Sequence, residues 1–178
     1  EFSGVPALAN VSFDVRPGEV HALLGENGAG KSTLMNVATG AFAPTSGEIR
    51  FNGQNVGALE PSAAIALGIA MVHQHPAVMP DLTVLENIQV ALPRDAFPTG
   101  QTDREFSQSL LDMVNLDVHL NERVEELSVA AKHLLEIAKA LAVKPKVLIL
   151  DEPTAPLGKE SVDLLFELIR KSVDEGTS

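Results

Sequence analysis

The sequence predicts an α/β fold, and three observations support this prediction. A β-prone segment, residues 20–24, runs directly into a glycine-rich loop, and the residues after the loop have helical apolar spacing. A second apolar run, residues 147–150, ends in two carboxylates, which is typical of a strand buried on both faces of a parallel sheet. Between them, the middle third of the chain carries apolar residues at helical spacing. Ligands of open α/β folds bind at the carboxyl ends of such strands.

Composition fits a single globular domain without disulfides. The chain has 178 residues, of which 45% are hydrophobic and 21% are charged, and it has no low-complexity tract. Cysteine is absent, which excludes disulfides and thiolate metal sites. The formal net charge is −11 and the basic residues are scattered, so we expect no nucleic-acid partner.

The first third of the chain predicts strands on both sides of the glycine loop. Residues 11–15 and 20–24 are β-prone, and a proline–glycine turn signal separates them. Residues 32–39 have helical spacing and stop at a glycine. Residues 46–56 then favour a short strand bounded by turns.

The middle third and the end of the chain predict helices. Thr83 and Glu86 have the capping-box spacing, in which two side chains satisfy free backbone donors at a helix start, so a helix is expected to begin near Val84. Three later segments also have helical apolar spacing: residues 103–116, 127–143 and 160–171.

Residues 61–80 are the one stretch with the length of a membrane span and no Asp, Glu, Lys or Arg. Their prolines, together with His73, Gln74 and His75, contradict a membrane span. The N-terminal residues contain no basic and then apolar leader, so no secretion signal is expected. The chain starts and stops without a methionine or an obvious terminus, and we expect a fragment of a longer protein.

The glycine loop matches the phosphate-binding pattern G-x-x-x-x-G-K-[ST] at Gly25, Gly30, Lys31 and Ser32. Glycine tolerates positive φ and has no Cβ, so the backbone N–H groups can face one anion. In this pattern the lysine reaches the β and γ oxygens of a nucleotide, the hydroxyl supplies a Mg²⁺ ligand, and the helix adds its positive end. The predicted nucleotide contacts are Gly25, Asn27, Gly28, Ala29, Gly30, Lys31, Ser32 and Thr33.

The second apolar strand predicts the other half of the site. Asp151 at the strand end can hold Mg²⁺ through its water shell, and Glu152 can polarise a water for attack on the γ-phosphate. The sequence therefore predicts hydrolysis of a nucleotide γ-phosphate with Mg²⁺ as a cofactor; the nucleotide is identified as ATP by the family resemblance described below. Two alternatives stay open: solvated acids that only cap a strand, and a nucleotide kinase. A kinase needs arginines to clamp a second phosphorylated substrate, and the arginines here are ungrouped.

With these motifs the chain resembles, over nearly all its length, the nucleotide-binding domain of ABC transporters. The resemblance implies a RecA-like P-loop NTPase core with an antiparallel β edge and an inserted helical subdomain. It implies a single domain over residues 1–178, truncated at both ends. Residues 1–75 and 143–178 would form the core with its β edge, and residues 76–142 would form the helical subdomain.

Two stretches extend the resemblance to the helical part. Gln74 in "MVHQHP", followed by "LTVLENI", is similar to the family's glutamine loop, which implies that Gln74 senses Mg²⁺ and that residues 74–87 touch membrane-spanning permease subunits. Ser128 in "LSVAAKHLLEIAKAL" stands where the family's signature begins a helix. It would cap that helix and bind the γ-phosphate of a partner domain's ATP. Residues 129–131 depart from the usual L-S-G-G-Q.

Three more comparisons with the family bear on the site. Phe2 stands where the family places an aromatic ring against adenine. The segment "PTAPLGKE" resembles the dimer-contact loop, with Gly158 where many members have aspartate. None of the 5 histidines is the family's switch histidine, which is expected after residue 178. The fragment itself is therefore expected to hydrolyse ATP weakly.

Within the family, "LSV", "EIAKAL" and "DEPTA-L" are similar to ATPases of bacterial importers for ribose, galactose and xylose. The resemblance implies a subunit that couples ATP-driven dimer closure to transport at the cytoplasmic face of the plasma membrane. Its partners would be permease subunits, a second nucleotide-binding domain in the same chain or a homodimer, and, indirectly, a substrate-binding protein. Two alternatives stay open: a nucleotide-binding module with little turnover, and a soluble non-transport ABC ATPase.

Overall fold

The structure, a computed structural model, describes residues 6–178. Its helices are α1 (Lys31–Ala38), α2 (Pro61–Leu67), α3 (Val84–Ala91), α4 (Asp103–Met113), α5 (Val129–Ala142) and α6 (Lys159–Asp174). Its strands are β1 (Arg50–Phe51), β2 (Gln54–Asn55), β3 (Ile69–Val72) and β4 (Val147–Leu150). Two single-turn 3₁₀ helices are η1 (Arg94–Ala96) and η2 (Val124–Glu126).

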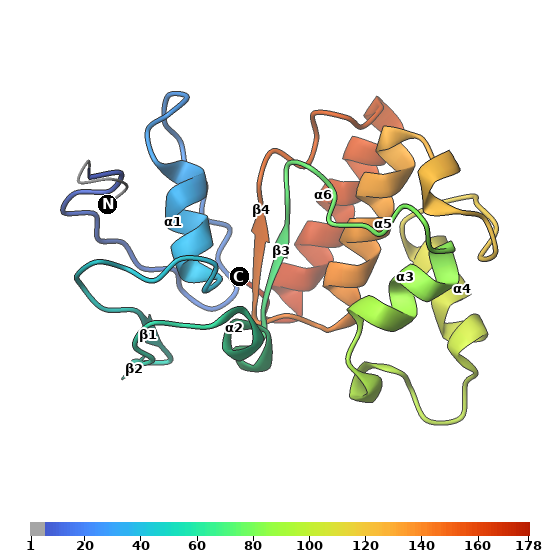
Figure 1. Cartoon of the computed structure of the whole chain (residues 1–178), viewed down its shortest axis with the longest axis horizontal. Helices are drawn as coiled ribbons and strands as arrows, with labels where there is room; N and C mark the ends of the chain where they lie inside the picture. Colours follow the sequence, from blue (N-terminus) through green and yellow to red (C-terminus); the bar gives the residue numbers. More distant parts are fainter. Residues whose placement is uncertain (1–5) are drawn as a thin grey trace.

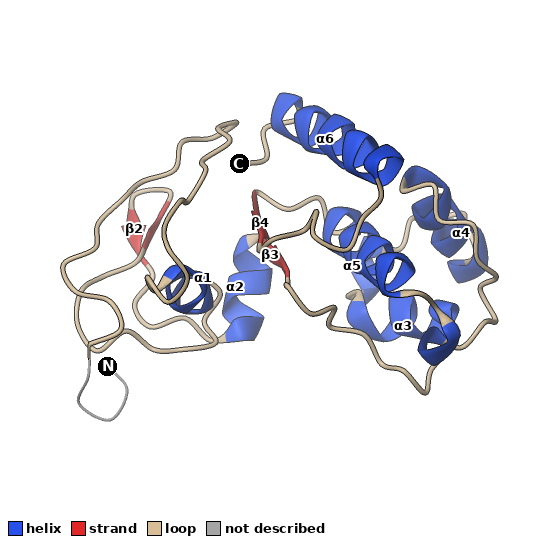
Figure 2. Cartoon of the chain, turned by 90° about the horizontal axis from the view of Figure 1, so that it is seen from above, coloured by secondary structure: helices blue, strands red, loops and turns tan. Residues whose placement is uncertain are grey.

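Strands β3 and β4 form a parallel pair at the centre of the molecule (Figure 1). Helices α1 and α2 lie on one side of this pair, and α5 and α6 lie on the other (Figure 2). Along β4, Leu148 and Leu150 pack against the larger apolar cluster, whereas Val147 and Ile149 pack against the smaller one. The prediction of a parallel strand with apolar contacts on both faces is therefore confirmed, although each of its residues is only half-buried.

The larger apolar core is built by the helices between residues 84 and 142. Val84 and Ile88 on α3, Leu111 on α4 and Leu135 on α5 are all fully buried. The spacing of Val84 and Ile88 places both on one face of α3, as the sequence pattern predicts. The helix of residues 84–91 begins with the predicted capping box, since the Thr83 hydroxyl accepts from the Glu86 N–H at 3.2 Å.

The prediction of strands at residues 11–15 and 20–24 is wrong for the described part of the chain. The turn between them forms, with the Glu19 N–H donating to the Arg16 carbonyl at 3.1 Å. Within residues 6–178, neither segment forms backbone hydrogen bonds with a neighbouring strand, and the side chain of Leu24 does not pack, since this residue is 89% exposed. A β-prone sequence forms a strand only when a neighbouring strand accepts its hydrogen bonds.

The strand predicted within residues 46–56 is a hairpin instead. Its two short strands, β1 and β2, pair antiparallel and are joined by Asn52 and Gly53. Both linking residues have positive φ, 50° and 77°, which suits a tight hairpin turn between right-twisted strands. The hairpin supplies the antiparallel element that the predicted fold includes.

The uncharged stretch of residues 61–80 divides into short elements. It holds α2, strand β3 and the loop after that strand, and the sequence analysis placed no helix or strand there. Among residues 6–178, no helix combines the length and apolar character needed to cross a bilayer.

Candidate functional site

The glycine loop of residues 25–30 leads directly into α1. Gly28 and Gly30 have positive φ, 82° and 93°, and Gly30 is the N-cap of the helix. A Cβ at Gly30 would lie 2.8 Å from the carbonyl oxygen of Ala7 and 2.9 Å from a methyl carbon of Leu8. Glycine at position 30 is therefore required by backbone conformation and by close approach of another segment.

Lys31, the first residue of α1, folds back over this loop. Its Nζ donates to the carbonyl oxygen of Gly25 at 2.7 Å and to that of Glu26 at 3.0 Å. Within residues 6–178, no carboxylate forms a salt bridge with this ammonium group. A cation that is held by neutral carbonyls beside a helix N-terminus attracts an anion such as a phosphate.

Ser32 and Asp151 meet although 119 positions separate them. The Ser32 hydroxyl donates to Oδ2 of Asp151 at 3.2 Å. Asp151 directly follows β4, and its N–H donates to the Val72 carbonyl at the end of β3 at 3.0 Å. The parallel strands thus place this carboxylate against the first turn of α1.

Gln74 and Glu152 form a second contact beside the first. The Gln74 side-chain amide donates to Oε2 of Glu152 at 3.1 Å. Gln74 follows β3 and Glu152 follows β4, so both lie past the carboxyl ends of parallel strands. Glu152 has a φ of 49°, a left-handed conformation that non-glycine residues adopt at a cost of roughly 1–2 kcal/mol. Such strained backbone concentrates at functional sites.

The donor atoms gathered here fit the chemistry of a magnesium nucleotide. Ser32, Asp151 and Gln74 offer a hydroxyl, a carboxylate and an amide oxygen, which are the hard oxygen ligands that Mg²⁺ prefers. The loop before α1 offers backbone N–H groups and Lys31 offers a positive charge for phosphate oxygens. Glu152 carries a carboxylate, the kind of group that accepts a proton from water.

Three of the other predicted site residues lie within the same loop and helix. The Ala29 N–H donates to the Glu26 carbonyl at 3.1 Å, which tightens the turn that contains Asn27. Thr33 lies in the first turn of α1.

Ser128 is not brought to this site. Ser128 is the N-cap of α5, as predicted, and its hydroxyl accepts from the Ala131 N–H at 3.1 Å. Helix α5 lies on the other side of β3 and β4 from α1 (Figures 1 and 2). Phe2 falls outside the described residues.

A second group of polar residues around Gln74 was not predicted from the sequence. Oε1 of Glu136 on α5 accepts from both the backbone N–H of His73, at 3.1 Å, and the His73 ring Nδ1, at 2.9 Å. This hydrogen bond raises the pKa of His73. Lys139, one turn along the same helix, donates to the Ala77 carbonyl at 2.9 Å, and burial lowers its pKa. The available signal was the pair of charges in the apolar run "LLEIAKAL".

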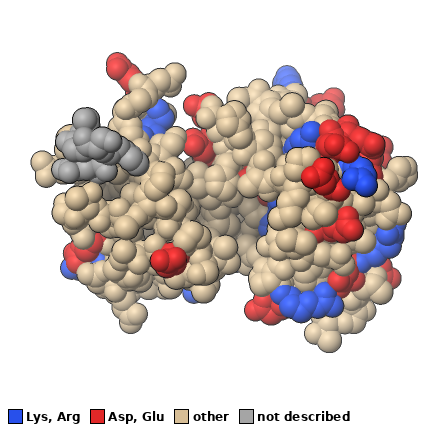
Figure 3. Space-filling view, viewed as in Figure 1, with Lys and Arg blue, Asp and Glu red and all other residues tan. Residues whose placement is uncertain are grey.

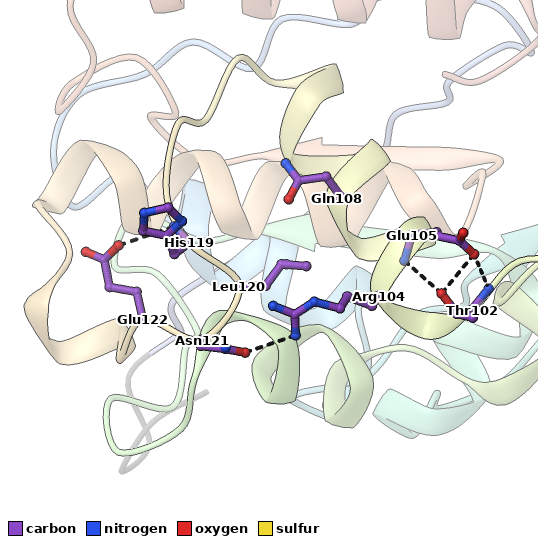
Figure 4. A pocket seen from close by; sticks show the side chains of 8 residues that line it. All are labelled: Thr102, Arg104, Glu105, Gln108, His119, Leu120, Asn121 and Glu122. Atoms are coloured by element: carbon purple, nitrogen blue, oxygen red, sulfur yellow. Dashed lines mark hydrogen bonds between the residues drawn. The ribbon is translucent and has the colours of Figure 1, made fainter.

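A hollow of about 890 Å³ lies elsewhere, on α4 and the loop before η2 (Figure 4). Several of its polar side chains bond within the hollow, as in the hydrogen bond from Arg104 to Asn121 at 3.0 Å and the capping box of Thr102 and Glu105. None of the predicted site residues lines this hollow, so it is separate from the predicted nucleotide site. Its lining residues are Thr102, Arg104, Glu105, Gln108, His119, Leu120, Asn121 and Glu122.

Sequence comparison shows which family the chain matches. Residues 8–155 match the family described as ABC transporter. The chain is 46% identical to a ribose import ATP-binding protein of Rhizobium meliloti, over 98% of this chain and 34% of that protein. It is 45% identical to a putative ribose/galactose/methyl galactoside import ATP-binding protein of Agrobacterium fabrum, over 96% of this chain and 34% of that protein. The chain thus spans about a third of the length of these relatives.

Solved structures confirm the predicted fold class. A nucleotide-free ATP-binding cassette from an ABC transporter superposes with a TM-score of 0.84 at 27% identity, covering 99% of this chain and 75% of that one. A dimeric cassette in a post-hydrolysis state, bound to ADP and Pi, superposes with a TM-score of 0.82 at 28% identity, covering 95% and 75%. The loop, the two strand ends and the family match agree, and this chain belongs to the ABC transporter family.

Proposed function

We propose that this chain is the ATP-binding and ATP-hydrolysing part of an ABC importer for a simple sugar. The observation that carries the proposal is the pair of contacts at the strand ends, Ser32 with Asp151 and Gln74 with Glu152. The first contact joins the phosphate-loop helix to the carboxylate predicted to hold Mg²⁺. The second joins the loop after β3 to the carboxylate predicted to activate water. The names of the relatives, ribose and galactose import ATP-binding proteins, support the sugar class.

In the proposed reaction, each residue acts through an atom that the structure locates. The N–H groups of the glycine loop and the Lys31 Nζ bind the phosphates, and Lys31 exchanges its two loop carbonyls for phosphate oxygens. Ser32 and Asp151 would hold Mg²⁺, with Gln74 at the same edge. Mg²⁺ held by these residues would supply positive charge that offsets the charge of the phosphates. Glu152 orients a water and accepts its proton.

The proposed permease contact is the region around residues 74–87, which includes the first half of α3. Met79 in this region is exposed, and Val90, three residues beyond Asn87 on α3, is 61% exposed. Exposed apolar side chains of this kind are available to a partner surface. The names of the relatives, import ATP-binding proteins, support a peripheral position at the cytoplasmic face of a bacterial plasma membrane, with a substrate-binding protein contributing indirectly.

The proposed contact with a second nucleotide-binding domain, in the same chain or in a homodimer, is the N-terminal end of α5. Ser128 is exposed there, and the neighbouring Val129 is 62% exposed. One of the similar solved cassettes is a dimer. We also propose that residues 1–75 and 143–178 form the nucleotide core and that residues 76–142 form the helical subdomain. The three helices α3, α4 and α5 all lie between residues 84 and 142, which supports this division.

The alternative of a nucleotide-binding module with little turnover has one observation in its favour. Val129, Ala130 and Ala131 occupy the signature positions, and their side chains present no polar atom beside Ser128. This alternative keeps the same nucleotide site and differs only in turnover.

The proposal is tested by calorimetric titration of Mg-ATP into the wild type, Lys31→Ala and Lys132→Ala. Lys132 is the matched control, because it is also half-buried and also donates its Nζ to a backbone carbonyl, that of Glu125 at 3.1 Å, but lies on α5. We expect binding in the wild type and in Lys132→Ala, and loss of binding in Lys31→Ala. Equal affinities in all three proteins would contradict the proposal.

A further inference from the structure

The loop that carries Gln74 is fastened to α5 at two points. Glu136 holds His73, one residue before Gln74, through two hydrogen bonds to one carboxylate oxygen. Lys139 holds the carbonyl of Ala77, three residues after Gln74. Gln74 therefore lies between two anchors that come from consecutive turns of a single helix.

Both anchors are buried charges, which makes their contacts energetically significant. Glu136 is 3% exposed and Lys139 is 9% exposed. A buried charge is costly unless hydrogen bonds or an opposite charge compensate it. Oε1 of Glu136 and the Lys139 ammonium group both bond to the loop of residues 73–77. The opposite charges of these two side chains on α5 also offset each other. The loop and the helix are therefore expected to move together.

We propose that Glu136 and Lys139 are positioning residues that hold the Gln74 amide against Glu152. This inference rests on the proposed function, because it assigns α5 a part in that same hydrolysis reaction. The chain of contacts runs from Glu136 on α5, through the His73 backbone, to Gln74, and from the Gln74 amide to Glu152 at 3.1 Å.

The same helix begins at Ser128, the residue proposed to face a partner domain. Because α5 is a continuous helix from Val129 to Ala142, a displacement of its N-terminal end also displaces Glu136 and Lys139. The anchors would convert that displacement into a change at Gln74. Helix α5 thereby links the partner-facing end of the domain to the residues around the reacting phosphate.

The test uses the complete protein and four variants: Glu136→Ala, Glu136→Gln, Lys139→Met and Ile137→Val. Glu136→Gln keeps an oxygen that accepts from the His73 backbone, so it serves as the conservative rescue. Ile137→Val is the control for packing, since Ile137 is buried on α5 and has no hydrogen-bonding side chain. ATP turnover is divided by the measured number of ATP-binding sites, and the Mg²⁺ concentration for half-maximal turnover is recorded.

A purely structural role would reduce the number of binding sites and leave turnover per site and Mg²⁺ response unchanged. The positioning role predicts that Glu136→Ala and Lys139→Met lower turnover per site about tenfold and raise the Mg²⁺ requirement. It predicts that Glu136→Gln recovers most of the loss and that Ile137→Val matches the wild type. Amide hydrogen exchange in residues 73–78 should become faster in Glu136→Ala and not in Ile137→Val.

Two outcomes overturn the inference, and they are distinguishable. Wild-type hydrolysis that Glu136→Ala and Lys139→Met leave unchanged per site, with unchanged Mg²⁺ response, overturns the positioning role alone. Absence of ATP hydrolysis in the wild type, or wild-type hydrolysis that Lys31→Ala leaves unchanged, overturns the proposed function and this inference with it.

Discussion

Replacing Gly30 by alanine separates two reasons for a glycine in the phosphate loop. Gly30 has a φ of 93°, and a Cβ there would approach the Ala7 carbonyl oxygen to 2.8 Å. Gly47 is the matched control, because its φ is 95° and no atom lies within 4 Å of a Cβ placed there. Both substitutions impose the same backbone strain, and only Gly30→Ala adds a steric conflict.

The expected losses of stability follow from the backbone strain and from the steric conflict. A left-handed conformation costs an L-residue roughly 1–2 kcal/mol, so Gly47→Ala should lower the free energy of unfolding by about that amount. Forcing a methyl group into a packed space costs roughly 1–3 kcal/mol more. Gly30→Ala should therefore lower the free energy of unfolding by about 2–5 kcal/mol. Only Gly30→Ala should also weaken Mg-ATP binding, because only it distorts the phosphate loop.

Urea unfolding followed by circular dichroism measures both losses, and calorimetry measures Mg-ATP affinity. The reasoning would be refuted by equal losses of stability in the two variants. It would also be refuted by a Gly30→Ala protein that binds Mg-ATP as tightly as the wild type.

Three further predictions concern the helical part of the chain. Thr83→Ala removes the hydroxyl that caps α3 and should lower the free energy of unfolding by about 1 kcal/mol in urea titrations, and no change would contradict the cap. Leu111→Ala empties a fully buried site in the larger core and should cost about 2–5 kcal/mol in the same assay, whereas a loss below 1 kcal/mol would contradict that burial. The backbone N–H groups of Thr83 and Thr102 lower the pKa of Glu86 and Glu105 below the ordinary value of 4.5. Their stabilisation is therefore present above that pH and lost as pH falls through the folded-state values, so a double change of both glutamates to glutamine should flatten the acid limb of stability against pH.

Local signals predicted most of the helical part of the fold. The capping pattern at Thr83 and the apolar spacing of α5 are properties of neighbouring residues, and both act over one or two helical turns. The strand predicted at residues 147–150 also formed, because four consecutive apolar residues favour a central position in any sheet.

The strands predicted at residues 11–15 and 20–24 show the limit of such signals. A helix satisfies its own backbone groups, whereas a strand depends on a partner that the local sequence does not specify. Strand β3 was not predicted for a related reason: Ile69–Val72 forms a strand because it pairs with β4. The strand has only 4 residues, and the glycine and prolines near it weaken its β-strand pattern.

The candidate site likewise has features that the sequence predicts and features that only the structure shows. Fixed spacing within one loop predicted the roles of Lys31 and Ser32. Asp151 and Glu152 were singled out as carboxylates that follow an apolar strand, and Gln74 by its resemblance to the family's glutamine loop. The structure brings Ser32 against Asp151 and Gln74 against Glu152. Those particular contacts depend on how β3 and β4 align. The anchors on α5 had no comparable pattern, because a buried glutamate is recognised only when its partner loop is seen.

The most direct test of the central claim is the turnover of Glu152→Gln in the complete protein, with Glu167→Gln as the control. Glu167 is exposed on α6 and lies outside both the site and the segment that resembles the dimer-contact loop. We predict that Glu152→Gln binds Mg-ATP like the wild type and releases phosphate at least about a hundredfold more slowly, while Glu167→Gln is unaffected. Phosphate release by Glu152→Gln at the wild-type rate would show that Glu152 does not activate the attacking water and would contradict the account.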